Sequence, residues 1–150
     1  MNWKKKAAVG VLPLVLTAMT VAAPALGGHP LAAWAIREFF SRVCHQEAAR
    51  SFWLWGAPVA VCARCLGIYL GAAAGAWLVW QRRAAVWFLA VAAIVNGLDV
   101  VTEMAGLHGD WMDVRFVFGL ALGIGMAAVV AAAEGSPQRH RGTERIGASC

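Results

Sequence analysis

The sequence predicts an all-α membrane protein with four transmembrane helices and a short amphipathic helix at the membrane interface. The 150-residue chain is 61% hydrophobic and only 14% charged, with a mean hydropathy of +0.64, whereas about a quarter of the residues in a soluble domain are charged. Crossing about 30 Å of hydrocarbon takes roughly 20 helical residues. Four apolar segments have the length for this, namely Ala7–Leu26, Pro58–Trp80, Ala84–Met104 and Val114–Ala133.

Basic residues flanking these segments predict the orientation in a cell (inner) membrane. They precede the first segment, join the second to the third, and follow the fourth; they are Lys4, Lys5, Lys6, Arg82, Arg83, Arg139, Arg141 and Arg145. Short cytoplasmic loops carry the excess of Lys and Arg, so both termini are expected in the cytoplasm. Tryptophans cluster at the proposed inner and outer ends of the spans, where amphipathic rings prefer to lie. An alternative is that residues 1–25 are a secretory signal with a cleavage site near Ala23-Pro24-Ala25.

The remaining chain is assigned to one domain and a tail. Leu31–Val43 carries apolar residues at helical spacing and predicts an interfacial amphipathic helix that ends just before Cys44. Ser51–Pro58 is interpreted as a short aromatic connection, because Gly56 and Pro58 break regular structure. We expect residues 1–134 to form a single four-helix domain and the polar residues 135–150 to be a disordered cytoplasmic tail.

Glycines recur at four-residue spacing in the second and fourth segments. They are Gly67, Gly71 and Gly75, and Gly119 and Gly123. Small residues at this spacing let two helix backbones approach closely in a membrane. The favoured interpretation is packing of the second helix on the fourth within one chain, and the alternative is a homodimer formed through Gly67, Gly71 and Gly75.

Three cysteines at the outer end of the second segment are the most informative residues. Cys62 and Cys65 are three positions apart where a helix is expected to begin, so both sulfurs should lie on one face. A helix N-terminus and the neighbouring Arg64 would each favour the thiolate. Cys44, with His45 beside it, lies 18 positions before Cys62 and can be brought back by the loop. A structural disulfide would leave one of the three cysteines over.

Ionisable residues predicted within the membrane form a second candidate set. Asn96, Asp99 and Glu103 share one face of the third segment near its outer end, and such groups are functional candidates because they are costly in a bilayer. Arg64 and Arg115 lie at similar depth and are the natural partners of Asp99. The candidate catalytic residues are therefore Asp99, Arg64, Arg115 and Glu103, while His108, Asp110 and Asp113 belong to the outer turn.

This region contains three motifs, namely Cys44-His45-Gln46, Arg50-Ser51-Phe52 and Val61-Cys62-Ala63-Arg64-Cys65-Leu66-Gly67-Ile68-Tyr69-Leu70-Gly71. Together they resemble a family of small prokaryotic multi-span membrane proteins, the domain of unknown function 2085. Looser similarity continues through Asn96-Gly97-Leu98-Asp99 and Arg115-Phe116-Val117-Phe118-Gly119. The resemblance implies a multi-span membrane protein and supports the choice of Cys44, Cys62, Cys65, Arg64, Asp99 and Arg115. It implies no particular activity.

Three functional interpretations follow from these residues. In the first, Cys44, Cys62 and Cys65 bind zinc or copper(I), with His45, Asp99 or His108 as the fourth ligand. In the second, Cys62 and Cys65 form a thiol–disulfide redox pair linked to a quinone, and Cys44 exchanges with a membrane or extracytoplasmic partner protein. In the third, the chain is a non-catalytic scaffold or partner subunit. Nucleic-acid binding is not expected, because the net charge of +5 is explained by the basic flanks.

Overall fold

The computed structural model describes residues 3–78, 81–107, 109 and 111–134, and this part of the chain is mainly helical. The helices are α1 (Trp3–Ala25), α2 (Pro30–Ser41), α3 (Ala63–Gly75), α4 (Arg82–Met104) and α5 (Met112–Glu134). A 3-10 turn, η1 (Ala48–Arg50), and two short strands, β1 (Trp53–Leu54) and β2 (Ala57–Pro58), lie between α2 and α3. The predicted tail, residues 135–150, lies outside the described residues.

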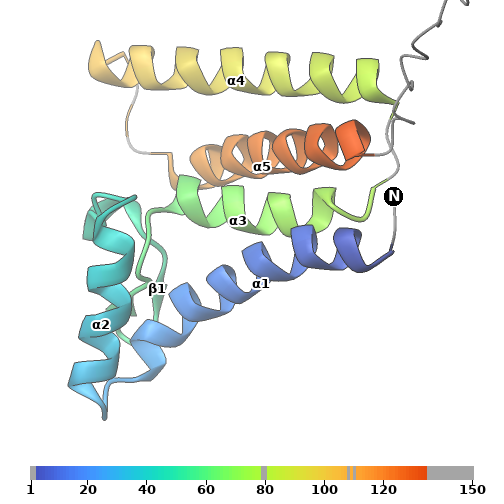
Figure 1. The fold of residues 1–150 in the computed structure, drawn as a ribbon. Coiled ribbons are helices and arrows are strands. Elements are labelled where there is room, and N and C mark those ends of the chain that lie inside the picture. The colour runs from blue at the N-terminus through green and yellow to red at the C-terminus, as the bar shows by residue number, and fades with distance from the viewer. Residues whose placement is uncertain (1–2, 79–80, 108, 110, 135–150) are drawn as a thin grey trace, which may run out of the picture.

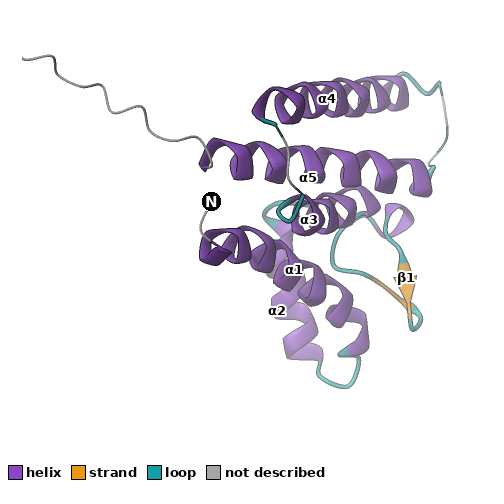
Figure 2. Cartoon of the chain, turned by 90° about the vertical axis from the view of Figure 1, so that its right-hand side faces the viewer, coloured by secondary structure: helices purple, strands orange, loops and turns teal. Residues whose placement is uncertain are grey.

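The helices are arranged in layers. Helix α5 lies between α3 and α4, and α1 lies on the other side of α3 (Figures 1 and 2). Helix α2 and the strands lie at one end of this stack, together with the connection from α4 to α5 (Figure 1). The N-terminal end of α1, the C-terminal end of α3 and the C-terminal end of α5 lie at the opposite end (Figure 1). The ends of the helices therefore lie at two opposite ends of one stack (Figure 1).

Two of the four predicted spans are confirmed in length and composition. Helices α4 and α5 are each 23 residues long, and their most apolar windows have mean hydropathies of 2.0 and 2.3. The apolar stretch described for α1 is shorter, Val9–Ala25. Helix α3 has only 13 residues, which corresponds to about 20 Å at 1.5 Å per residue.

The prediction of one helix over Pro58–Trp80 is therefore wrong in its extent. Ala57–Pro58 forms strand β2, and Cys62 is the N-cap of α3 with extended dihedral angles (φ −69°, ψ 161°). The segment before α3 is extended because its amides bond elsewhere: the Val59 amide donates to the Phe52 carbonyl at 2.9 Å, and the Ala60 amide donates to the Thr20 carbonyl of α1 at 3.2 Å. Helix α3 thus begins at the cysteine pair and does not cross the full hydrocarbon thickness as a helix.

Helix α4 presents one apolar stripe to its surroundings and one small or polar stripe to the protein. The exposed side chains recur at steps of three and four; they are Trp87, Val91, Ile94, Leu98 and Val101. The buried positions on the opposite face are Ala85, Ala92, Asn96 and Asp99. An apolar outer stripe together with a polar inner one is the pattern of a helix that contacts lipid on one side and the protein on the other.

Close packing of α3 on α5 explains the glycine spacing. A Cβ atom on Gly67, Gly71 or Gly75 would collide with the backbone of α5, at Phe116, Leu120 and Ile124 in turn. The contact is reciprocal, because Gly119 and Gly123 lie against backbone atoms of Arg64 and Ile68. The favoured interpretation of the glycines, intrachain packing, is confirmed. Their surface is occupied by α5, so a homodimer through the same three glycines has no support in this arrangement.

The segment between α2 and α3 differs from a plain loop. Trp55 (φ 49°) and Gly56 (φ 79°) both have positive φ and form a two-residue turn between the antiparallel strands, as a type I′ hairpin requires. The fold is therefore helical with one small hairpin. The predicted amphipathic helix over Leu31–Val43 is confirmed as α2, which buries Phe40 and exposes Leu31, Trp34 and Phe39.

Tryptophans gather at the two ends of the helix stack, as the sequence predicts. Trp53 and Trp55 belong to the hairpin and Trp111 directly precedes α5, whereas Trp77 follows α3 and Trp87 lies in the second turn of α4. The hairpin and the start of α5 lie at the end of the stack that carries α2, and the end of α3 and the start of α4 lie at the opposite end (Figure 1). All five have more than half of their surface exposed. Trp80, which the sequence assigns to the second group, lies outside the described residues. Two levels of exposed indole rings are what a membrane protein presents to its two interfaces.

Candidate metal centre

The structure brings the three cysteines of the predicted site together. Cys44 follows α2, Cys62 caps the N-terminus of α3, and Cys65 lies in its first turn. Their three Sγ atoms all lie within 4.8 Å of one another, and all three are free thiols. Cys44 is buried, with 7% of its surface exposed, and Cys62 and Cys65 are partly buried. Two segments distant in sequence thus form one sulfur cluster at a helix N-terminus.

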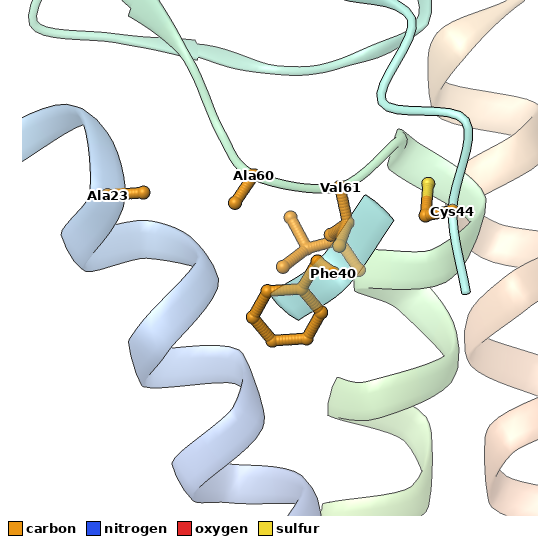
Figure 3. Packing of buried hydrophobic residues seen from close by; sticks show 6 residues of the cluster. Ala23, Phe40, Cys44, Ala60 and Val61 are labelled. Atoms are coloured by element: carbon orange, nitrogen blue, oxygen red, sulfur yellow. The ribbon is translucent and has the colours of Figure 1, made fainter. Parts of the chain in front are cut away.

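A buried aromatic residue and a turn place Cys44 at this position. Phe40 is fully buried and anchors the end of α2 between α1 and α3 (Figure 3), and the Cys44 amide donates to the Phe40 carbonyl at 2.9 Å. Gln46 then adopts a positive φ of 54°, which is uncommon for a side chain other than glycine. The Cys44 side chain faces α3, because its Sγ atom accepts a hydrogen bond from the amide of Cys62 at the start of that helix.

Arg37 joins the Cys44 segment to the segment that precedes Cys62. Its carbonyl accepts a hydrogen bond from Gln46 Nε2 at 2.5 Å, and its guanidinium donates to the Pro58 carbonyl at 2.6 Å. Hydrogen bonds from a charged donor are stronger than neutral ones. Arg37 was not chosen from the sequence as a site residue, since nothing in its spacing distinguishes it from the other arginines of the loop.

Hydrogen-bond donors around Cys44 favour its thiolate form. The Cys62 amide, at the N-terminus of α3, donates to Cys44 Sγ at 3.2 Å. Hydrogen bonds from the Cys62 and then the Cys65 side chain hold the pKa of Cys44 well below its usual range, even though burial acts in the opposite direction. A thiolate is the form of cysteine that binds metals and attacks disulfides.

The cysteines line a cavity of about 370 Å³. Its wall also contains polar and charged residues, and the full set is Val43, Cys44, His45, Gln46, Glu47, Arg50, Cys62, Arg64 and Cys65. The group of converging ligand atoms consists of the three cysteines and does not include His45. His45 is exposed on the wall of the same cavity, so its role as the fourth ligand stays a prediction. His108, the other histidine considered, lies outside the described residues.

A network of ion pairs lies beside the cavity. Asp99 faces the bundle and pairs with Arg64. Glu103 pairs with Arg115 and with Arg50, and the nitrogen–oxygen distance is 2.8 Å in both of these pairs. The expected partnership of Asp99 with Arg64 is thus present. Because Glu103 is also 3.8 Å from Arg64, η1, α3, α4 and α5 are all joined by charged side chains at this end of the stack.

The network is buried to different degrees. The exposed fraction of the side chain is 6% for Asp99 and 5% for Arg115, but 24% for Arg64. Of the four residues named as catalytic candidates, Arg64 is the one that lines the cysteine cavity. Asp99 contacts the cavity-lining Arg64, and Glu103 contacts Arg50 and lies 3.8 Å from Arg64. Arg115 pairs with Glu103.

Arg50 is a site residue that the choice of candidates missed. It lines the cysteine cavity and pairs with Glu47 at 3.1 Å as well as with Glu103. The signal was present in the motif Arg50-Ser51-Phe52: Ser51 is fully buried, and the Phe52 ring packs edge-on against Phe116, with centroids 5.6 Å apart. The buried Ser51 and the packed Phe52 ring fix the backbone next to Arg50, whose side chain pairs with Glu103 of α4 and lines the cysteine cavity.

Comparison with known proteins agrees with this description. The family model described as "Predicted membrane protein (DUF2085)" matches residues 44–129. The uncharacterized protein MJ1492 of Methanocaldococcus jannaschii is 34% identical over 92 residues, which cover 56% of this chain and 58% of that relative. An uncharacterized protein of Methanothermobacter thermautotrophicus is 35% identical over 95 residues, which cover 60% of this chain and 86% of that relative.

The match to the Methanocaldococcus protein therefore spans little more than half of its length. No solved structure matches the chain. The matched region begins at Cys44 and includes Cys62, Cys65 and the ion-pair network, so the candidate centre lies wholly within it. The chain belongs to the DUF2085 family of predicted membrane proteins.

Proposed function

We propose that this protein binds one metal ion, zinc or copper(I), through Cys44, Cys62 and Cys65. The observation that carries the proposal is the convergence of three free thiols, from two separate segments, to within 4.8 Å of one another. The Cys62 amide that donates to Cys44 Sγ supports it, because hydrogen bonds around ligand atoms orient and stabilise a metal site. Soft thiolate ligands select these ions.

The geometry fits a tetrahedral site with one remaining position. Zinc–sulfur bonds of about 2.3 Å place two thiolates of a tetrahedron roughly 3.8 Å apart. Sulfurs already within 4.8 Å reach that separation by small side-chain rotations. His45 on the cavity wall is the fourth ligand that we propose for a closed structural site. Water or a substrate in that position would instead make the site catalytic, as three protein ligands and an open position do in zinc enzymes.

We further propose that the centre lies on the outer side of the cell membrane, with both termini in the cytoplasm. The arrangement of the helices supports this, because the cysteines lie at the end of the stack that carries α2, opposite the N-terminal end of α1 (Figure 1). The basic residues that flank the spans are then on the cytoplasmic side, as the excess of Lys and Arg in cytoplasmic loops requires.

The second candidate function is thiol–disulfide exchange. It is favoured by the lowered pKa of Cys44, since a thiolate is the attacking species in exchange. In this scheme a quinone takes two electrons and two protons from the Cys62 and Cys65 thiols, which form a disulfide. The Cys44 thiolate attacks this disulfide and releases one of the two cysteines as a thiolate, and a partner dithiol then resolves the new Cys44 disulfide and is itself oxidised. A partner subunit without catalysis is the third candidate, and its cysteines would then be structural.

Metal analysis of the purified protein, paired with a thiol count, separates these functions. We expect one equivalent of metal and three thiols that react with a thiol reagent only after a chelator is added. Cys44→Ser, Cys62→Ser and Cys65→Ser should each lose the ion, because each removes one ligand. Cys150→Ser is the matched control and should keep it. A metal-free protein with a reducible bridge between Cys62 and Cys65 would overturn the metal proposal in favour of exchange.

A further inference from the structure

A second and larger cavity adjoins the cysteine centre. It has a volume of about 620 Å³ and lies between α1, α2 and α3; its wall is formed by Leu16, Trp34, Ala35, Glu38, Phe39, Phe40, Arg42, Val43 and Tyr69. Val43, the neighbour of Cys44, lines both this cavity and the cysteine cavity. The side chain after the end of α2 therefore borders both spaces.

The wall of this second cavity, which we call the lateral cavity, is mainly apolar and includes two exposed charged residues, Glu38 and Arg42. Phe40 is fully buried at its inner side, where its ring lies between α1 and α3 (Figure 3). Trp34, Phe39 and Val43 are more than half exposed around it. A volume of 300–1,000 Å³, with mainly apolar walls and a few polar groups, is typical of a site for a small hydrophobic molecule.

The two charged residues in the wall of the lateral cavity have opposite charges. Arg42 and Glu38 lie one helical turn apart, 3.3 Å from each other, with 79% and 47% of their side chains exposed. An exposed pair of this kind contributes little to stability, so both groups are free to exchange their partner for a ligand. Together they match the phosphate and the ammonium group of a zwitterionic lipid head.

We propose that the lateral cavity binds one hydrocarbon chain of a membrane phospholipid, with its phosphate on Arg42 and its head directed toward the cysteine centre. The lipid bilayer supplies this ligand at high local concentration, because α2 presents its apolar side chains outward as an interfacial helix does. The substrate class of the cysteine centre is then a lipid-like amphiphile. That last step rests on the proposed metal function, whereas binding of the chain does not.

Native mass spectrometry of the delipidated full-length protein in a nonionic detergent tests the site. The probe is palmitoyl-oleoyl-phosphatidylethanolamine, titrated from low concentration. The wild-type protein should retain one lipid molecule. Ala35→Trp should lose it, because an indole at this position fills the cavity. Ala93→Trp is the matched control, since Ala93 is an exposed helical alanine on α4, and it should retain the lipid.

A milder variant guards against a folding defect. Arg42→Gln removes an exposed charge together with its exposed ion pair to Glu38, which contributes little to stability. It should weaken lipid binding about fivefold, the equivalent of about 1 kcal/mol for one basic residue at a lipid surface. Equal retention by Ala35→Trp and Ala93→Trp would overturn the proposal. Preference for a prenyl alcohol or a free fatty acid over the phospholipid would also overturn it.

Metal analysis of the same samples keeps the two proposals apart. If Ala35→Trp loses lipid but keeps the metal, both proposals stand. If the wild-type protein holds no metal and Ala35→Trp still loses lipid, the lateral cavity stands and the metal function fails. If the metal is present and lipid retention does not depend on Ala35, the lipid proposal fails alone.

Discussion

Replacing Asp99 by asparagine should destabilise the protein through the arginine that it leaves behind. Asp99 is buried and pairs across the helix interface with Arg64. Removing one partner of a buried ion pair costs about 3–5 kcal/mol, because the other charge stays in a poorly solvated place. Arg64 is 24% exposed and keeps Glu103 at 3.8 Å, so we expect a value near the lower end, about 3 kcal/mol.

The assay is reversible unfolding in mixed detergent micelles, followed by tryptophan fluorescence. Glu38→Gln is the matched control, because it removes a carboxylate from the exposed pair with Arg42, and it should cost at most about 0.5 kcal/mol. The double change Arg64→Met with Asp99→Leu removes both charges and should be less destabilising than Asp99→Asn alone. Equal free energies of unfolding for Asp99→Asn and Glu38→Gln would refute the description of Asp99 as one half of a buried pair.

Three further predictions concern packing, the Cys44 thiol and topology. Gly71→Ala should lower the free energy of unfolding by about 1–3 kcal/mol, since the added Cβ atom meets the backbone of α5. Gly97→Ala is the control and should cost nothing, because no atom lies within 4 Å of its added Cβ atom. Equal effects of the two substitutions would contradict the packing of α3 on α5. In metal-free protein, the rate of alkylation of Cys44 should change little between pH 9 and pH 6, because the lowered pKa of Cys44 keeps its thiolate populated over this range. The alkylation rate of a free cysteine falls more than about a hundredfold over the same range. An equal fall in the rate at Cys44 would contradict this prediction. Reporter fusions at Gly106 and Gly135 should report extracytoplasmic and cytoplasmic positions respectively, and a cytoplasmic signal at Gly106 would reverse the orientation.

The main features of the site were predictable because they depend on local spacing and on the cost of charge in a bilayer. Cys62 and Cys65 at i, i+3 had to share a face once a helix began there. Asp99 had to find a cation within the bundle, and Arg64 is at the matching depth on α3. The glycine spacing likewise identified the surface on which α3 meets α5.

What the sequence did not show depends on backbone geometry and on long-range partners. Hydropathy alone does not distinguish an extended apolar segment from a helix, so Pro58–Trp80 was assigned to one span although α3 covers only Ala63–Gly75. The hairpin depends on positive φ at Trp55, which a tryptophan rarely adopts. Arg37 acts through the Gln46 side chain and the Pro58 carbonyl, and no periodicity reports such a bridge.

X-ray absorption at the metal edge of the purified protein tests the central claim most directly. The account predicts three sulfur neighbours at about 2.3 Å and one lighter ligand for a zinc-loaded sample. Changing any one of Cys44, Cys62 and Cys65 to serine should remove this signature. A metal with only nitrogen and oxygen neighbours, or a signature that survives these substitutions, would contradict a metal centre built on the three cysteines.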